Sequence, residues 1–306
     1  MSGPTSIELR CPAKVNLALS VSAPTTGGMH PIASWMVAVD LVDSLTLSRR
    51  DDGRSTFDIA FADDADCPCR GMRVDWPLES DLAVRAHGAL ERHVGRALPT
   101  SVRLRKSIVA GGGLGGGSSD AAGVLVGLRR LFELEIDDAE LRRVGMTLGS
   151  DVGFAVGALT GWPSAIVTGL GEQVAPAARS QVIHLVLVFP PFGCATGKVY
   201  QAFDELIRSS GRAGIAPDAA AVRRLAAMAK LPADGPFNDL AGPACAVEPR
   251  LHELRQRVAA VAGLPVHVSG SGSTLFVVTA DGEAAAALAA SITRQTHLSA
   301  VATRTV

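Results

Sequence analysis

Six of the seven residues from 111 to 117 are glycine, and this tract limits the possible fold more than any other segment. Glycine reaches positive φ angles and leaves backbone N–H groups open to a ligand. Before the tract, residues 101–108 begin with the polar and apolar alternation of a half-buried strand. After it, residues 118–120 (Ser-Ser-Asp) are good N-cap types for a helix whose apolar residues recur over 121–132. The segment therefore predicts a strand, a bare loop and a helix N-terminus, which together suit a polyphosphate.

Three other interpretations of the glycine tract have to be weighed. A flexible linker would have neither a strand before it nor a capped helix after it. A Walker A loop needs a lysine after its last glycine, whereas Ser118 and Ser119 follow directly here. Gly111, Gly113 and Gly116 match the dinucleotide-binding fingerprint, but a tract this rich in glycine matches almost any glycine pattern. The acidic residues about 20 positions further on end a helical pattern, where that fingerprint expects the end of a strand.

Composition narrows the class of protein. The chain has 306 residues, 47% of them hydrophobic, and a net charge of -1. This length is sufficient for two ordinary domains, and the balanced charge gives no reason to expect a nucleic acid or a membrane as partner. Five cysteines without a disulfide-like framework favour a reducing cytoplasm. Cys67 and Cys69 have no second Cys/His pair at ligand spacing, so no metal site is expected from side chains.

Hydrophobic periodicity predicts an α+β fold that ends in an antiparallel sheet. Its strands are expected at 7–22, 32–41, 101–108, 182–189, 274–279 and 298–305, with antiparallel strands within 44–75 and a hairpin within 164–176. Helices are expected at 81–94, 139–148, 217–230, 239–262 and 282–296, and from Thr196 as a cap. The domain boundary is expected between about 165 and 180.

Single residues in these elements allow more than one interpretation. Lys14 and Asn16 point to the same side of the first strand, about 7 Å apart along it. The lysine either meets an anion or faces water. His30 follows a Gly-Gly turn and is either a ligand contact or a surface histidine. Asp151 lies between Gly149 and Gly153 and either points inward or forms an ordinary turn or N-cap.

Four segments taken in order resemble the GHMP small-molecule kinases: 13–17, 111–120, 149–152 and 269–273. The resemblance covers essentially the whole chain. It implies a two-domain α+β fold, with an N-terminal domain of the ribosomal-protein-S5-domain-2-like type at 1–175 and a C-terminal ferredoxin-like α/β sandwich with an antiparallel sheet at 176–306. The long form Gly-Leu-Gly-Gly-Gly-Ser-Ser resembles the branch that phosphorylates a cytidine diphosphate alcohol in isoprenoid biosynthesis. Gly28-Met29-His30 and Phe237-Asn238-Asp239-Leu240 resemble the same branch.

The resemblance also implies roles for individual residues. Asp151 corresponds to the catalytic aspartate that takes the proton of the attacking hydroxyl, and Lys14 to the lysine that holds it. The ATP-binding loop corresponds to Val109, Ala110, Gly111, Gly112, Gly113, Leu114, Gly115, Gly116, Gly117, Ser118 and Ser119. Substrate-binding positions correspond to Asn16, His30, Thr196 and Tyr200, with His30 reading the cytosine edge. A supporting loop corresponds to Ser269, Gly270, Ser271 and Gly272. ATP and Mg²⁺ are the implied cofactors, and the protein would be a monomer or a homodimer.

Three positions depart from the branch pattern. Met29 stands where an aromatic residue usually precedes the histidine, Ala241 replaces an acidic residue, and Asp81 replaces an asparagine near the adenine. Tyr200 would then stack against a thioether on one side of the cytosine. The remaining alternatives are a GHMP kinase of the homoserine or mevalonate type, a dinucleotide-binding oxidoreductase, and a non-catalytic nucleotide-binding regulator.

Overall fold

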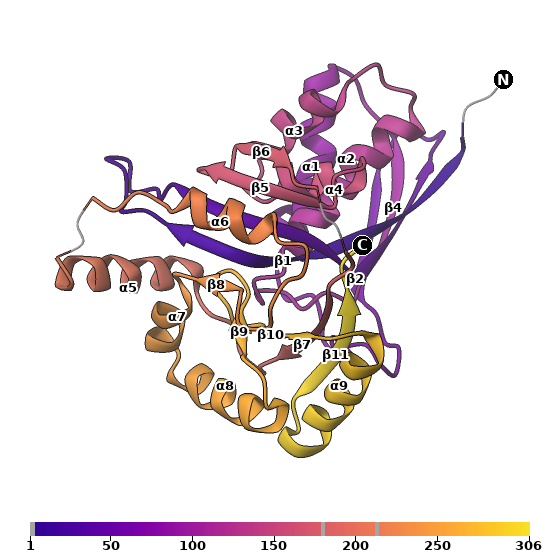
Figure 1. Ribbon diagram of the computed structural model, residues 1–306. Coiled ribbons are helices and arrows are strands. Elements are labelled where there is room, and N and C mark those ends of the chain that lie inside the picture. Colours follow the sequence, from indigo (N-terminus) through magenta and orange to yellow (C-terminus); the bar gives the residue numbers. More distant parts are fainter. Residues whose placement is uncertain (1–3, 179–180, 212–213) are drawn as a thin grey trace. The chain divides into compact units, whose positions relative to one another are not determined.

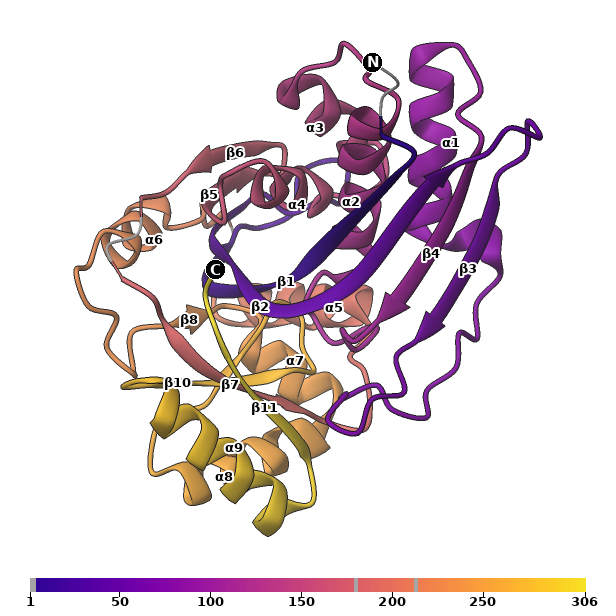
Figure 2. The ribbon, with the colours of Figure 1, turned by 90° about the vertical axis from the view of Figure 1, so that its right-hand side faces the viewer.

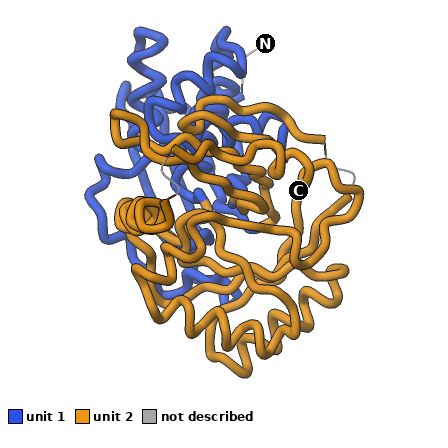
Figure 3. The backbone as a smooth tube through the Cα atoms, turned by 60° about the vertical axis from the view of Figure 1, so that its left-hand side comes forward, with its two compact units in different colours: residues 1–13, 41–109, 115–163 blue, residues 14–40, 110–114, 164–306 orange. Residues whose placement is uncertain are grey.

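Two long strands, β1 (Ser6–Val21) and β2 (Ile32–Arg49), link the two compact units of the chain (Figure 1; Figure 3). The computed structural model describes residues 4–178, 181–211 and 214–306. The first unit holds residues 1–13, 41–109 and 115–163, and the second holds residues 14–40, 110–114 and 164–306. Since β1 and β2 pass through both, the units are interleaved along the chain. They do not coincide with the consecutive domains expected at 1–175 and 176–306, which stay a prediction.

In the first unit, strand β4 (Thr100–Lys106) lies between β2 and β3 (Thr56–Phe61) (Figure 2). It pairs antiparallel with β2 and parallel with β3. Helix α1 (Leu82–Val94) connects β3 to β4 and supplies the crossover that a parallel pair requires. The expectation of antiparallel strands throughout 44–75 is therefore wrong for β3, because its partner comes from beyond the next helix.

The helices of the first unit begin at residues that explain their starts. Asp81 caps α1 by accepting the N–H of Ala83, and Asp137 caps α3 in the same way, as expected. Helix α2 starts earlier than expected, with Gly115 at the N-cap in a left-handed conformation, φ 67°. The Ser-Ser-Asp residues at 118–120 therefore lie inside the helix. The bounds are α2 Gly116–Leu131, α3 Asp138–Met146 and α4 Val152–Leu159.

Helix α2 packs closely on β1 and β2 through two glycines. A Cβ at Gly123 would lie 2.4 Å from Cys11 Sγ, and one at Gly127 would lie 2.4 Å from Leu47 Cδ1. A side chain in either place would have to displace these packed atoms, and its absence lets the helix backbone approach the strands directly. Buried Leu, Val and Ala side chains of the helices and strands complete this core. Helix α2 is thereby fixed directly on the two strands.

The second unit contains a four-stranded antiparallel sheet in the order β11-β7-β10-β9, which confirms the predicted C-terminal antiparallel sheet. Its strands are β7 His184–Phe189, β9 His267–Val268, β10 Leu275–Thr279 and β11 Ser299–Arg304. The helices of the unit are α5 Thr196–Ser209, α6 Ala219–Ala226, α7 Ala241–Val247, α8 Pro249–Ala262 and α9 Gly282–Thr296. The single helix expected at 239–262 is broken at Pro249, which cannot continue a helix but suits the first turn of α8.

The remaining strands of the second unit extend β1 and β2. Strand β2 pairs antiparallel with β5 (Ser164–Gly169), which forms the predicted hairpin with β6 (Gln173–Pro176). Strand β1 pairs in parallel with the two-residue strand β8 (Phe237–Asn238). Among the described residues, no helix is both long and apolar enough to cross a membrane.

Candidate active site

In the second unit, residues 110–114 of the glycine loop are tied to β1 and to the turn before β10. Lys14 N–H donates to the carbonyl of Leu114 at 2.9 Å, which joins the loop to β1. Thr274 N–H donates to the carbonyl of Gly112 at 3.1 Å. These backbone bonds do not depend on side-chain rotamers, so the loop is fixed in place by its own main chain.

Gly113 is the point of closest approach between the loop and the turn at residues 269–272. Its φ is +79°, and a Cβ there would lie 2.3 Å from the carbonyl oxygen of Ser269 and 3.1 Å from that of Gly272. Ser269 Oγ also donates to the carbonyl of Gly113 at 3.2 Å. A residue with a side chain would meet both a backbone clash and an unfavourable φ, so this position requires glycine.

Lys14 and Asn16 lie on the same side of β1, as the strand periodicity predicted, and they form a buried pair. Lys14 Nζ donates to Asn16 Oδ1 at 2.6 Å, and the two residues are 7% and 2% exposed. Asn16 Nδ2 donates to Ser34 Oγ at 2.8 Å, and that hydroxyl donates to the carbonyl of Ala18. Lys14 is thus not a solvent-facing strand lysine. Because Ser34 fixes the amide of Asn16, Asn16 holds the ammonium group in one direction.

His30 lies in an aromatic cluster at α5. Its ring centroid is 4.8 Å from that of Tyr200 and 6.2 Å from that of Phe203. Its Nε2 is 2.8 Å from Asp204 Oδ1. Met29 is 55% exposed. Tyr200 therefore packs on the histidine ring itself, where the sequence had suggested a thioether.

Thr196 begins α5 but does not cap it, contrary to expectation. The N-cap is Ala195, and no side chain makes a capping hydrogen bond there. The hydroxyl of Thr196 instead lies 2.9 Å from Ser271 Oγ, in the turn that also contacts Gly113. The structure therefore brings expected positions of the second unit onto one connected framework, which includes Lys14, Asn16, Gly113, Thr196, Ser269 and Ser271.

In the first unit, one expected segment and one expected residue lie at helix starts. Residues 116–119 form the first turn of α2, and no side chain caps it. Such a turn presents N–H groups and the positive end of the helix dipole. Asp151 occupies the N-cap position of α4, with φ −80° and ψ −13°, yet its carboxylate makes no capping bond. Asp151 therefore holds the N-cap position, one of the expected alternatives, without the side-chain bond that a capping residue usually makes.

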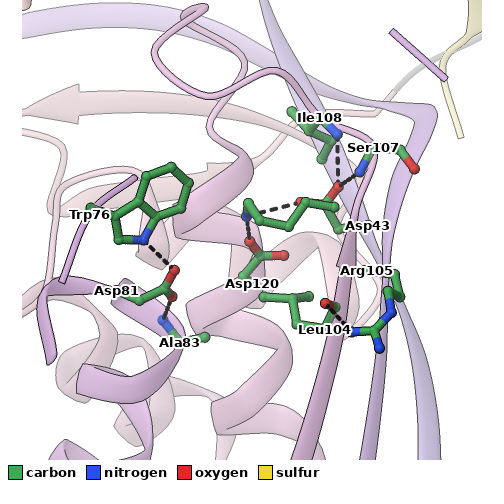
Figure 4. Close-up of polar contacts among 10 residues, drawn as sticks. Asp43, Trp76, Asp81, Ala83, Leu104, Arg105, Ser107, Ile108 and Asp120 are labelled. Carbon is green, nitrogen blue, oxygen red and sulfur yellow. Dashed lines mark hydrogen bonds and ion pairs between the residues drawn. The ribbon is translucent and has the colours of Figure 1, made fainter. Parts of the chain in front are cut away.

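A buried charge cluster of the first unit, formed by Asp43, Lys106 and Asp120, was missed by the sequence analysis (Figure 4). Lys106 contacts both carboxylates, at 3.3 Å for Asp43 Oδ2. All three side chains are almost fully buried. A signal was present in the sequence, because Lys106 continues the buried face of Val102 and Leu104 on β4.

The cluster holds the chain immediately before the glycine tract. Asp43 Oδ1 accepts the N–H groups of Ser107 and Ile108 at 2.5 and 2.8 Å (Figure 4). Although burial opposes it, the attraction of Asp120 and Asp43 raises the pKa of Lys106, so the ammonium stays charged. Burial, together with the charge of Asp43, raises the pKa of Asp120. Within the described part of the chain, Asp120 Oδ1 has no hydrogen-bond partner.

Asp81, which replaces an asparagine of the branch pattern, uses its carboxylate in hydrogen bonds within the protein. Its two carboxylate oxygens accept the indole N–H of Trp76 at 2.9 Å and the N–H of Ala83 at 2.8 Å (Figure 4). The residue is 6% exposed. The acidic side chain is therefore explained by capping α1 and anchoring the loop before it.

Comparison with known proteins defines the class first. Residues 81–161 match the family model of the GHMP kinases N terminal domain. A solved homoserine kinase from Cytophaga hutchinsonii is 15% identical, covers 100% of this chain and 96% of its own, and superposes with a TM-score of 0.65. At that identity the likeness concerns the fold alone. The GHMP kinase fold is thereby confirmed.

Closer relatives define the branch. A 4-diphosphocytidyl-2-C-methyl-D-erythritol kinase from Thermobifida fusca is 34% identical, over 95% of this chain and 93% of the relative. Its namesake from Symbiobacterium thermophilum is 34% identical over 91% and 92%. A solved structure of 4-(cytidine 5'-diphospho)-2C-methyl-D-erythritol kinase is 30% identical, covers 98% of this chain and 100% of its own, and has a TM-score of 0.76. The chain belongs to the 4-diphosphocytidyl-2-C-methyl-D-erythritol kinase family.

Proposed function

We propose that this chain transfers a phosphoryl group from ATP to a hydroxyl of 4-(cytidine 5'-diphospho)-2-C-methyl-D-erythritol, the 2-hydroxyl, in the non-mevalonate route to isoprenoids. The relatives that are named for this activity align with this chain over nearly their whole length. The observation that carries the proposal is the glycine loop bonded directly to the strand of Lys14 and Asn16 in a chain of this family. A phosphate cradle and a buried, oriented ammonium are what transfer to an alcohol needs.

The ATP triphosphate is the proposed ligand of residues 109–119. Support comes from each unit separately. In the second, Gly113 allows only a bare backbone. In the first, the uncapped start of α2 offers N–H donors to an anion. In the absence of a Walker lysine, the loop itself supplies no cation, so charge neutralisation falls to other groups.

Mg²⁺ is the proposed companion of the nucleotide. Among the described residues, no group of three or more His, Cys, Asp or Glu side chains could hold a metal. A Mg²⁺ ion would then be bound mainly through nucleotide phosphates and water, which is this ion's usual mode in kinases. When bound, the ion would neutralise charge on the phosphates. The protein residues then need only to position the phosphates and the acceptor.

The proposed catalytic residues are Asp151 of the first unit and Lys14 of the second. Asp151 would accept the proton of the attacking hydroxyl, and Lys14 would orient the reacting oxygens. Two observations support these roles. Asp151 stands at a helix start without capping it, and Lys14 is buried with its direction set by Asn16.

The proposed substrate contacts are Asn16, His30, Thr196 and Tyr200. Asp204 supports the role of His30, because a carboxylate only accepts and therefore places the hydrogen of a neutral ring on Nε2. The other ring nitrogen is then an acceptor, which suits the amino group of cytosine. Tyr200 lies against the same ring and offers a face for base stacking.

The proposed reaction is tested directly with purified protein and Mg-ATP. We expect ADP formation with 4-(cytidine 5'-diphospho)-2-C-methyl-D-erythritol, and at least about a hundredfold lower kcat/KM with homoserine or mevalonate. The phosphorylated position is read by ³¹P–¹H NMR. Faster turnover of homoserine or mevalonate would assign the chain to a different acceptor. Tight NADH binding without ATP binding would instead indicate an oxidoreductase.

The proposed role of the loop gives a second expected result. Gly113→Ala should weaken ATP binding by at least about tenfold, since the new methyl group meets two carbonyl oxygens at a positive φ. Isothermal calorimetry with ATP measures this without the acceptor. Gly242→Ala is the matched control, because a Cβ at that helical glycine meets nothing within 4 Å. Equal affinities of both variants would separate the loop from nucleotide binding.

A further inference from the structure

Asn238, in the two-residue strand β8, uses every hydrogen-bonding group of its side chain. Its amide Nδ2 donates to the carbonyls of Val268 and Gly270 at 2.9 and 2.7 Å. Its Oδ1 accepts the N–H of Leu240 at 2.8 Å. The amide orientation is fixed by chemistry, since the reverse orientation would set an oxygen against two carbonyl oxygens. No other residue type offers two donors and one acceptor in this small planar shape.

The two carbonyls that Asn238 holds belong to Gly270, in the turn at residues 269–272, and to Val268, just before it. Ser269 lies between them, and its hydroxyl donates to Gly113 while accepting the N–H of Asn16 at 3.4 Å. A Cβ on Gly270 would lie 3.4 Å from Lys14 Nζ, so the turn backbone packs directly against the lysine. The position of this turn therefore sets the positions of the glycine loop and the Lys14–Asn16 pair.

Asp239, the residue that follows Asn238, fixes this segment of the chain to β1. Asp239 Oδ2 accepts the hydroxyl of Ser20 and the N–H of Val21, each at 2.9 Å. Asp239 N–H donates to the carbonyl of Leu19 at 2.9 Å. Asn238 thus contacts the turn from a segment that is hydrogen-bonded to the strand that carries Lys14 and Asn16.

We propose that Asn238 is a positioning residue for phosphoryl transfer, which sets the spacing between the glycine loop and the Lys14–Asn16 pair through the turn at 269–272. The proposal rests on the proposed function of that loop, and it assigns Asn238 no contact with ATP or the alcohol. Its effect should appear in nucleotide binding and in turnover alike, because the turn contacts both the loop and the lysine.

The proposal is tested with Asn238→Leu, which has a similar shape and no donor. We expect kcat/KM for ATP to fall by about tenfold or more, since both carbonyls and one N–H lose their partner. The dissociation constant for ATP, measured calorimetrically without the alcohol, should rise in parallel. Thr296→Val is the control for lost stability. Thr296 is buried in the same unit and also makes two hydrogen bonds, to Ile292 and from Leu298.

Thr296→Val should lower the melting temperature comparably and leave ATP affinity within about twofold of the parent. If Asn238→Leu behaves like this control, the role of Asn238 is merely structural and the proposal fails. The binding measurement also separates this failure from a failure of the proposed function. If the chain binds ATP but phosphorylates a different alcohol, the proposed substrate is wrong. The same comparison of Asn238→Leu with Thr296→Val then decides the role of Asn238 with that alcohol as acceptor.

Asn238→Asp supplies a second test if the leucine variant folds poorly. A protonated carboxyl can donate one hydrogen bond to a carbonyl, whereas a carboxylate places negative charge against two carbonyl oxygens. Activity of this variant should therefore be partly restored at low pH and fall as pH rises through the pKa of the new group. The parent enzyme and Asn238→Leu should lack this additional ionisation. A pH profile that matches the parent's would overturn the requirement for a donor.

Discussion

Replacement of Asp151 by asparagine is expected to lower kcat by about 10²- to 10⁴-fold and to leave ATP affinity within about twofold of the parent. Asparagine keeps the shape of the side chain but cannot take a proton from the attacking hydroxyl. Because Asp151 does not cap α4, the substitution removes no capping bond. Stopped or steady-state assays give kcat, and calorimetry gives the dissociation constant for ATP.

Asp137→Asn is the matched control for Asp151→Asn. Asp137 lies at another helix start in the same unit and accepts the N–H of Glu140 at 2.7 Å, a bond that asparagine also makes. Its kcat should stay within about twofold of the parent. Near-normal turnover by Asp151→Asn would remove Asp151 from the mechanism, whereas an equal loss in both variants would point to a general effect on the helices.

Replacement of Lys106 by methionine should have the largest effect on stability. It leaves the carboxylates of Asp43 and Asp120 buried without their cation, and removal of one partner from such a group costs about 3–5 kcal/mol. Urea denaturation measures the free energy of unfolding. ATP affinity should fall as well in the folded fraction, since Asp43 holds the N–H groups just before the glycine tract.

Arg105→Met is the control on the same strand. Arg105 pairs with Asp58, and their side chains are 38% and 58% exposed, so its loss should cost less than about 1 kcal/mol. Adding Asp120→Asn to Lys106→Met should recover part of the lost stability, because one uncompensated carboxylate disappears. A Lys106→Met protein as stable as Arg105→Met would show that the buried cluster does not carry this part of the fold.

Local periodicity predicted the elements around the glycine tract and the shared side of Lys14 and Asn16. Both follow from neighbouring residues, whose geometry depends on φ and ψ alone. The insertion of β4 between β2 and β3 could not be predicted in this way, because strand order depends on contacts between distant segments. The N-cap of α2 was misplaced for another reason. Serine and aspartate are favoured caps, but a glycine in the left-handed conformation had already turned the chain.

The buried charges and the role of Asn238 were missed for a different physical reason. Lys106 and Asp120 belong to residue types that are almost always exposed, and only a partner from another element makes their burial tolerable. That partner, Asp43, lies on β2, far from both in sequence. Asn238 was noted only as part of a family motif, and its function as a donor depends on two carbonyls that follow it much later in the chain.

The interleaving of the two units has a consequence for the order in which the chain folds during synthesis. Residues 14–40 leave the ribosome early, but they belong to a unit whose other strands begin only at β5. Strand β1 waits still longer for its partner β8, which lies at residues 237–238 of 306. Such long-range pairing slows folding and leaves apolar strands exposed in the meantime. The strand that carries Lys14 is therefore made early, while its surroundings are completed only after most of the chain has been translated.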